Sequence, residues 1–396
     1  MASIDTAARA PQRSLSLNDP FVRGIIYQAF TALIVIGSIA WIINNTAENL
    51  KAQNKTTGFD FLWKTSGFNI SFSLFPFDRT SFYWEAFLVG LTNTILVSAI
   101  GIVLATILGF TIGIARLSSN YLVSRLATIY VETIRNIPLL LQLFFWYFAV
   151  LKTMPSVRES LALPFDTFIN QRGLYVPRPI FDDQFAWVWL GLAVGLAAWI
   201  GIGSWAKRRL ERTGQRFPVF IAGLAVTVIA AAVVWVLSGA AVSFDPPVLN
   251  RFNFKGGVEL PPELVALAFG LTIYTAAFIA ETVRAGIESV SHGQTEAARA
   301  LGLKEGDRLR LVIVPQAMRV IIPPLTSQFL NLTKNSSLGA AIGYPELVNV
   351  FAGTTLNQTG RAIEVISLTM LVYLTLSLST SAVMNWYNAR VALVER

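Results

Sequence analysis

Hydrophobic residues in this chain form long uninterrupted runs that are separated by shorter polar segments. A run of roughly 18 or more apolar residues can cross a hydrocarbon layer about 30 Å thick, because an α-helix rises about 1.5 Å per residue. The pattern predicts eight such spans: Ile25–Ile43, Ala86–Ala115, Leu122–Leu151, Phe185–Ala206, Phe217–Leu237, Leu264–Val283, Val320–Ile342 and Ile363–Trp386.

Composition agrees with an all-α, polytopic membrane protein, since 54% of the residues are hydrophobic and 14% are charged. A polar tail, residues 1–24, precedes a span-length run without a small-residue cleavage site, so we expect a retained helix there. The chain has no cysteine, which excludes disulfides and thiolate metal sites. It also has no Gly-Lys dipeptide, so it lacks a P-loop and is not itself an ATPase.

The basic residues predict the orientation of the spans. Eight spans place both termini, the turn 116–121 and the loops 207–216 and 284–319 on one side, and these segments hold more than half of the 31 basic residues. Lys and Arg next to spans stay on the cytoplasmic side. We therefore expect an N-in, C-in topology, and we interpret the net charge of +8 as an orientation signal, with no role in nucleic-acid binding.

The loop 284–319 is long for a simple connection and should contain structure of its own. Ser291 and Gln294 have the spacing of a capping box, and Glu296 would then lie in the first helical turn. Gly302 suits the left-handed position that ends a helix. We predict a two-turn helix over 294–301 with Ala297, Ala298 and Leu301 on one side, and a second short helix from Asp307 to Pro315.

A helix of two turns is too short to be stable in water by itself, so it needs a surface on which to dock. Its small alanine side chains would allow close approach to a groove, and charged residues would surround the contact: Glu296, Arg299, Glu305 and Arg308. The alternative is that the loop packs only on its own spans.

The order Glu296-Ala297-Ala298, then Gly302 three residues after Arg299, then Ile313 and Pro315, resembles the EAA loop of bacterial ABC importer permeases. The resemblance implies that this loop is a coupling helix that seats in a cleft of the ATP-hydrolysing subunit. The segments "YVETIRNIPLLLQLFFWYF" and "LTKNSSLGAAIG" are similar to the polar amino acid permease family in particular. That similarity covers Ala86–Leu151 and Leu264–Trp386.

The family resemblance implies a type I permease-like core of five helices, built from residues 86–151 and 264–396. Residues 25–85 would add an N-terminal span with a periplasmic loop, and residues 152–263 would insert a loop and a two-span hairpin at the periphery. Most of the family reads Arg-Gly-Thr-Pro and Lys-Asp-Thr-Ser where this chain has Arg135-Asn136-Ile137-Pro138 and Lys334-Asn335-Ser336-Ser337. These departures and the added spans resemble the larger branch for general L-amino acids, or for acidic ones and their amides.

The same resemblance implies a non-catalytic subunit in the bacterial inner membrane. Its expected partners are an ATP-binding subunit, a second homologous permease and a periplasmic amino acid binding protein. The chain itself would need no cofactor, because ATP and Mg would bind to the partner ATPase.

Ionisable residues inside spans are costly, so each one is a candidate for function. Arg135 and Lys334 lie in spans of the same direction, each about 20 Å from the cytoplasmic end, and should share a depth. Ser327 and Asn331 precede Lys334 at helical spacing and predict a polar stripe. Glu132 lies one turn before Arg135 and Asn136.

Proline 138 removes an amide donor and frees the carbonyl of Ile134, which predicts a broken helix beside a polar chamber. In that chamber Lys334 or Arg135 would bind a substrate carboxylate, and Glu132 or Asn331 an ammonium group. The alternative is that Glu132 pairs with Arg135 or Lys334 and only holds the spans together. Glu281 and Arg284 have the spacing of a purely structural pair.

Two other classes of function compete with an importer subunit. An ion-coupled secondary transporter would show paired broken helices in inverted repeats, whereas the coupling-type loop occurs once. A membrane-embedded transferase would need a cluster of His or carboxylate residues, which the sequence does not show. "GIGSWA" at Gly201–Ala206 matches a dinucleotide fingerprint but ends an apolar span with no preceding strand, so we reject it as a nucleotide site.

Overall fold

The computed structural model describes residues 20–52, 58–215 and 217–391. Seven of the described helices are long and apolar enough to cross a membrane, or eight when one bent pair is counted as a span. The α-helices are α1 (Pro20–Ala52), α2 (Tyr83–Arg116), α3 (Tyr121–Asn136), α4 (Leu139–Phe144), α5 (Ala186–Thr213), α6 (Val219–Ser238), α7 (Pro262–Glu288), α8 (His292–Ala300), α9 (Glu305–Arg308), α10 (Val314–Asn335), α11 (Leu356–Thr359) and α12 (Ala362–Val391).

Short 3-10 and π-helical segments extend or connect these helices. The 3-10 segments are η1 (Asp60–Trp63), η3 (Val157–Glu159), η4 (Asp183–Phe185) and η6 (Ser336–Ile342), and the π segments are η2 (Phe145–Leu151), η5 (Leu309–Ile313) and η7 (Val348–Thr355). The predicted all-α membrane part is confirmed. The break expected within the span Leu122–Leu151 is present and sharp, since α3 and the α4–η2 segment meet at an angle of 105°.

Helices α2 and α7 cross at very short distance and form the centre of the core. A methyl group on Gly109 would lie 2.6 Å from the Cβ of Ile279, and one on Gly113 would lie 2.8 Å from the carbonyl oxygen of Ala280. Only glycine permits backbones to approach so closely, which is the role of small residues spaced four apart in membrane helices. Gly109 and Gly113 therefore serve the packing of α2 on α7.

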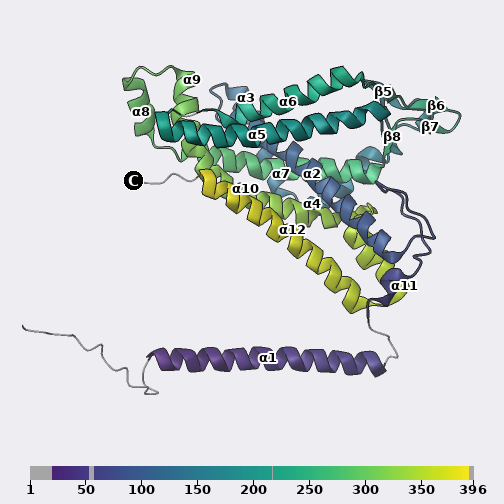
Figure 1. Ribbon diagram of the computed structural model, residues 1–396. Coiled ribbons are helices and arrows are strands. Elements are labelled where there is room, and N and C mark those ends of the chain that lie inside the picture. Colours follow the sequence, from purple (N-terminus) through teal and green to yellow (C-terminus); the bar gives the residue numbers. More distant parts are fainter. Residues whose placement is uncertain (1–19, 53–57, 216, 392–396) are drawn as a thin grey trace, which may run out of the picture.

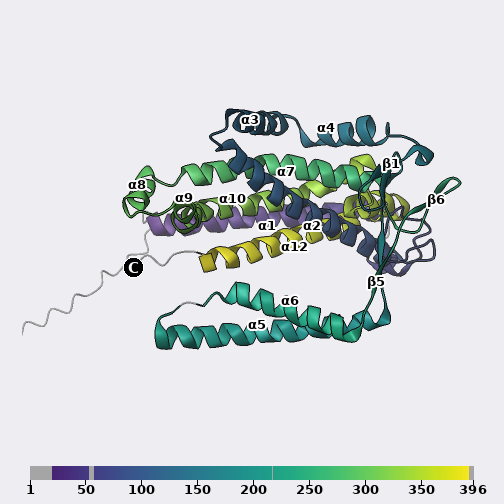
Figure 2. The same cartoon turned by 90° about the horizontal axis from the view of Figure 1, so that it is seen from above.

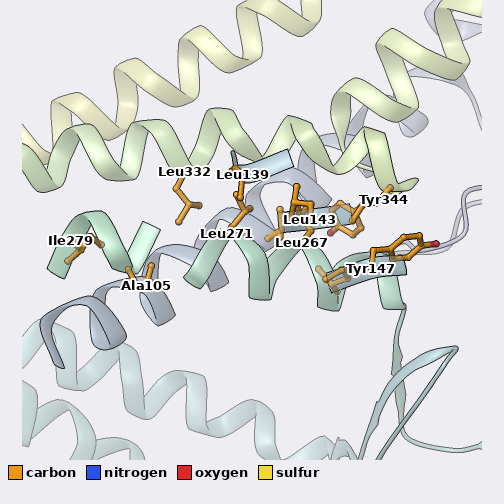
Figure 3. Packing of buried hydrophobic residues seen from close by; sticks show 14 of the residues in the cluster. Ala105, Leu139, Leu143, Tyr147, Leu267, Leu271, Ile279, Leu332 and Tyr344 are labelled. Atoms are coloured by element: carbon orange, nitrogen blue, oxygen red, sulfur yellow. The ribbon is translucent and has the colours of Figure 1, made fainter. Parts of the chain in front are cut away.

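Around this crossing, side chains of α2, α4, α7 and α10 form one apolar cluster (Figure 3). Leu271 on α7, Leu143 on α4 and Leu332 on α10 are fully buried within it. Leu332 also fills the space in front of Gly101, whose added methyl would lie 3.2 Å from a Leu332 methyl carbon. The cluster fixes the position of α10 along α2 and therefore the distance between Lys334 on α10 and Arg135 on α3.

Helices α5 and α6 form the predicted peripheral hairpin. Gly195 lets the helices meet, since a methyl there would lie 2.5 Å from the Cα of Thr227. Figure 2 shows this hairpin apart from the remaining helices and joined to them at one end through strands. Helix α1 also lies apart from the other helices in Figure 1, and its most apolar segment has no buried residue.

Eight short strands lie in the insert between residues 152 and 263, a feature that the sequence analysis did not predict. β1 (Leu161–Leu163), β2 (Thr167–Asn170), β3 (Gly173–Val176) and β8 (Val258–Leu260) form one antiparallel sheet, β4 (Arg178–Phe181) pairs with β5 (Val242–Asp245), and β6 (Val248–Asn250) pairs with β7 (Asn253–Lys255). Tyr175 is buried against Phe254 in a small core of its own. The strands gather at the end of the molecule opposite α8 (Figures 1 and 2).

The segments expected on one side of the membrane do lie at one end of the molecule. The α2–α3 turn, the α5–α6 turn and α8 are all found at that end (Figures 1 and 2). We call it the α8 end. The 19 residues that begin the chain, most of the predicted N-terminal tail, lie outside the described residues.

Replacing Gly109 with alanine should destabilise the protein, because the added methyl meets Ile279 at a distance that forces α2 and α7 apart. Overpacking of this kind costs about 1–3 kcal/mol. We expect a lower midpoint of thermal unfolding in detergent for Gly109→Ala. The matched control is Gly201→Ala on α5, where nothing lies within 4 Å of the new methyl and the midpoint should not fall. Equal midpoints for the two variants would contradict the packing argument.

Candidate functional site

The loop after α7 folds into α8, but its start differs from the prediction. Ser291 occupies the N-cap position without a side-chain cap hydrogen bond, so the expected capping box is absent. The side chain of Gln294 instead accepts a hydrogen bond, at 3.3 Å, from Nε2 of Gln316 on α10. Because α8 begins at His292, Glu296 lies beyond the first turn, and the expected dipole contact of Glu296 was wrong.

The end of α8 agrees with the prediction. Gly302 has φ of +73°, in the left-handed region. The Leu303 N–H donates to the Ala298 carbonyl at 3.1 Å, and the Gly302 N–H donates to the Arg299 carbonyl at 2.9 Å. These two bonds define a Schellman motif, which a left-handed glycine permits. Nothing lies within 4 Å of a methyl added at Gly302, so the backbone conformation is its main constraint.

Arg308 joins α8 to the next helix. Its Nη1 donates to Thr295 Oγ1 at 2.9 Å and its Nε to Glu305 Oε2 at 3.0 Å. The side chain of Arg308 is only 11% exposed, so it braces the loop from inside and does not frame an outer contact as expected. The second short helix begins at Glu305, two residues before the predicted start, and continues through the π segment η5 into α10.

The two sides of α8 are unequal. Ala298 is 3% exposed, so it faces the rest of the chain, contrary to the predicted common side with Ala297 and Leu301. Ala297 is exposed and Leu301, four residues later, is 80% exposed. Glu296 and Arg299 are exposed as well. The outer surface of α8 therefore has a small apolar centre between an acid and a base, while its inner side rests on the start of α10.

The predicted polar stripe on α10 exists and lies on the outside of the chain. Ser327, Asn331 and Lys334 are all exposed, whereas Leu325 and Leu332 on the other side are buried. Among the described residues no carboxylate lies within 4.0 Å of the Lys334 ammonium group. Lys334 is in the last turn of α10, where the negative end of the helix dipole favours a cation.

The broken helix at Pro138 is confirmed, and its freed carbonyl has a protein partner. The Nε2 of Gln142 donates to the Ile134 carbonyl at 2.9 Å and to the Ile137 carbonyl at 2.9 Å. Gln142 is 5% exposed. A single buried amide thus donates to both carbonyls at the bend, so a protein side chain compensates for the break.

Glu132 and Arg135 belong to a cluster of ion pairs between α2, α3 and α7. Glu281 accepts a close contact from Arg116, pairs with Arg284 at 2.6 Å and lies 3.7 Å from Arg135 Nη1. Glu132 lies 3.6 Å from Arg116 Nη2. The expected pair of Glu281 and Arg284 is confirmed, but Arg116, which the sequence analysis passed over, is the buried centre of the cluster at 8% exposure.

Two further contacts place the α3 residues. The Arg135 guanidinium lies over the Phe278 ring, 5.1 Å from its centroid. The Nδ2 of Asn136 donates to the Glu132 carbonyl at 2.7 Å, within the last turn of α3. Both groups are therefore occupied by neighbours on α3 and α7.

The structure does not bring Arg135 and Lys334 to one depth. Arg135 joins the cluster that holds Arg116, at the last residue of α2. Lys334 lies two residues after Leu332, which packs on Gly101 of α2. Gly101 is about 22 Å from Arg116 along the axis of α2. The estimate of a shared depth assumed that α3 runs across the membrane parallel to α2, whereas Arg135 near the end of α3 shares Glu281 with Arg116 at the end of α2.

A buried carboxylate that the sequence analysis did not identify lies after Pro345. Glu346 is fully buried, and it accepts hydrogen bonds from the Val348 and Asn349 N–H groups and from the Tyr373 hydroxyl, at 2.7, 2.7 and 3.0 Å. An acid directly after a proline and before a helix is a recognisable N-terminal signal. Glu346 links η7 to α12 and thereby holds the segment that follows the polar stripe.

A protein-family model described as "Binding-protein-dependent transport system inner membrane component" matches residues 193–393, about half of the chain. The chain belongs to this family. The matched part contains α8, η5, α10 and α12, and with them the exposed outer side of α8 and the polar stripe on α10. Family members are permease components of binding-protein-dependent transport systems, and the chain is such a component.

Two relatives match over nearly their whole length. The "General L-amino acid transport system permease protein AapQ" of Rhizobium johnstonii is 50% identical over 96% of this chain and 95% of that protein. The "Putative amino-acid ABC transporter permease protein YhdX" of Escherichia coli is 49% identical over 97% of this chain and 98% of that protein. Among solved structures, an amino acid ABC transporter with histidines aligns with a TM-score of 0.47 and 21% identity, covering 78% of this chain and 95% of that one.

A third relative, the "Glutamate/glutamine/aspartate/asparagine transport system permease protein BztB" of Rhodobacter capsulatus, is 41% identical over 97% of both chains. Relatives described as permeases for general L-amino acids and for glutamate, glutamine, aspartate and asparagine therefore match nearly the whole chain, as the resemblance to the larger branch predicts. The extra helices α1, α5 and α6 are part of that shared length.

Replacing Gln142 with leucine should destabilise this permease, because the Ile134 and Ile137 carbonyls would lose their donor inside the core. A buried acceptor without a partner costs about 1–3 kcal/mol. We expect a lower midpoint of thermal unfolding for the detergent-purified Gln142→Leu protein. Gln328→Leu on α10 is the control, since Gln328 is half-buried and makes no hydrogen bond in the described part of the chain. A midpoint for Gln142→Leu no lower than that of the control would refute the role of the amide.

Proposed function

We propose that this chain is the membrane subunit of an ATP-driven importer of L-amino acids in the bacterial inner membrane. Its cargo is a broad range of L-amino acids, or acidic amino acids and their amides, delivered by a periplasmic binding protein. Relatives that match over nearly their full length and are described as amino acid permeases carry this proposal. ATP and Mg bind to a separate ATPase subunit, and this chain performs no chemistry.

The docking site for the ATPase subunit is the outer face of α8, and the support is its geometry. Leu301 at 80% exposure and exposed Ala297 give an apolar patch with no partner inside the chain, between Glu296 and Arg299. The inner side of α8 is tied to α9 and α10 through Arg308 and Gln316. A displacement of α8 would therefore be transmitted to the N-terminal end of α10, the helix that carries the polar stripe.

The substrate path follows the stripe on α10, at the junction with a second, homologous permease. Polar groups at membrane depth are costly in contact with lipid. The exposed side chains of Ser327, Asn331 and Lys334 thus need a wet surface or a protein partner outside the chain. Unpaired Lys334 can bind a substrate carboxylate, and Asn331 can accept from an ammonium group. Glu132 and Arg135 are assigned a structural role, because ion pairs occupy both.

An ion-coupled secondary transporter is the alternative, and α8 disfavours it. Such a protein has no need for a helix with an exposed apolar patch that is braced against a pathway helix. Gene neighbours that encode a P-loop ATPase and a secreted binding protein would separate the two classes directly.

Replacing Gly302 with valine should uncouple transport from ATP hydrolysis without disturbing the spans. Its φ of +73° disfavours a β-branched residue by about 1 kcal/mol or more, so the Schellman turn and the direction of α9 would change. We expect reduced co-purification of the ATPase subunit and reduced hydrolysis stimulated by loaded binding protein. Gly302→Asn should have a smaller effect, because asparagine tolerates the left-handed region.

The matched control for Gly302→Val is Gly306→Ala on α9, where a methyl also meets nothing within 4 Å and the backbone is helical. That variant should retain ATPase binding. If Gly302→Val bound and stimulated the ATPase as the unmodified chain does, the loop would be only a packed connector.

Replacing Lys334 with methionine should reduce uptake at low substrate concentration by about tenfold or more, since a hydrogen bond to a charged group contributes roughly 1.5–3 kcal/mol. Lys334→Arg should retain most of the uptake. Transport of labelled amino acids into proteoliposomes of the whole complex measures the effect. The control is Lys152→Met, a cation already paired with Glu263 at 3.7 Å. Normal uptake kinetics in Lys334→Met would exclude the stripe as the substrate path.

A further inference from the structure

The turn between α5 and α6 carries a dense group of cations at the α8 end. Lys207, Arg208, Arg209 and Arg212 fall within two turns of α5, with Glu211 as the only acid between them. The apolar part of α5 before them, residues 186–206, is about 31 Å long, which matches the hydrocarbon thickness. The cations therefore begin where the lipid headgroups begin.

Aromatic side chains fix this level. The Arg209 guanidinium lies over Trp205 and over Phe217, at 5.4 and 6.0 Å from the ring centroids. Its Nη2 also donates to Gln215 Oε1 at 3.1 Å, across the turn made by Gly214 at φ +70°. Tryptophan beside a span prefers the membrane interface. Trp205 on α5 and Phe217 before α6 thus hold the turn at the boundary between hydrocarbon and water.

Most of the positive charge of this turn has no counter-charge among the described residues. Among the described residues no carboxylate lies within 4.0 Å of the Lys207, Arg208 or Arg212 cationic groups, and all three side chains are exposed. The hairpin stands apart from the other helices in Figure 2, so lipid surrounds its helices. Lys207, Arg208 and Arg212 thus have no carboxylate partner among the described residues, and they lie at headgroup depth.

We propose that this basic turn, residues 207–215, binds the phosphate groups of anionic phospholipids in the leaflet at the α8 end. Arginine forks match phosphate oxygens in pairs, and each Lys or Arg near an anionic surface strengthens binding about fivefold. The site is independent of the amino acid cargo and of α8. It anchors the hairpin through lipid, because the hairpin has no extensive packing on the core. The competing partner at this end is an acidic surface of the ATPase subunit, which the headgroup depth of the cations disfavours.

Native mass spectrometry of the purified full complex tests the proposal, with phosphatidylglycerol and phosphatidylcholine supplied in equal amounts. Arg208→Gln, Arg209→Gln and Arg212→Gln are combined in one variant, which keeps Lys207 for orientation. The charge-matched control combines Arg79→Gln, Arg172→Gln and Lys255→Gln, three exposed cations of other loops. A third variant replaces the same three turn arginines with lysine. The chain has no cysteine, so Gln215→Cys reports the side of the turn by labelling with an impermeant maleimide.

We expect the preference for bound phosphatidylglycerol over phosphatidylcholine to fall about tenfold or more in the glutamine variant, with labelling of Gln215→Cys unchanged. The charge-matched control and the lysine variant should keep the preference. An unchanged preference in the glutamine variant overturns the proposal, as does an equal loss in the charge-matched control. Loss of the ATPase subunit with an unchanged lipid preference would assign the turn to that protein and would overturn the lipid site.

Discussion

The fold depends on the requirement that every backbone polar group at membrane depth has a hydrogen-bond partner, since no lipid can supply one. Pro138 violates that requirement locally by removing a donor and turning the chain through 105°. Gln142 restores it with one buried amide that serves two carbonyls. Because the bend carries α4 into contact with α7, the position of Leu143 in the central cluster follows from that repair (Figure 3).

Side-chain hydrogen bonds and a backbone turn connect α8 to α9 and α10. Helix α8 is too short to be stable alone, and its inner side is held by Arg308, by Gln316 and by the Schellman turn at Gly302. From Glu305 to Ile342 the chain is continuously helical, through a π segment and without a loop. A displacement at α8 therefore has a stiff route to the polar stripe, and Glu346 fixes the segment beyond it through η7 and α12.

Local signals in the sequence were sufficient for the spans, for the left-handed Gly302 and for the break at Pro138. Each of these depends on a run or a spacing that the chain displays by itself. The angle of the break, the inward side of Ala298 and the central place of Arg116 depend on which helices come into contact, and no periodicity encodes that. The error on Arg135 had the same origin, since its depth was counted as if α3 ran across the membrane, and the direction of α3 is set by its contacts with α2 and α7.

For the cations of this chain, the presence or absence of a carboxylate partner is a better guide to function than a position inside a span. Arg116, Arg135 and Arg284 share Glu281, and Glu132 and Glu288 supply two further carboxylates. Three cations thus face three anions, and such a network holds helices together with little net charge to attract a ligand. Lys334 and the cations of the α5–α6 turn have no carboxylate within 4.0 Å in the described part of the chain. An exposed cation near lipid is stable only where an anion or water reaches it. These unpaired cations are the ones for which we propose ligands outside the chain: a substrate carboxylate beside α10, and lipid phosphate at the end of the hairpin.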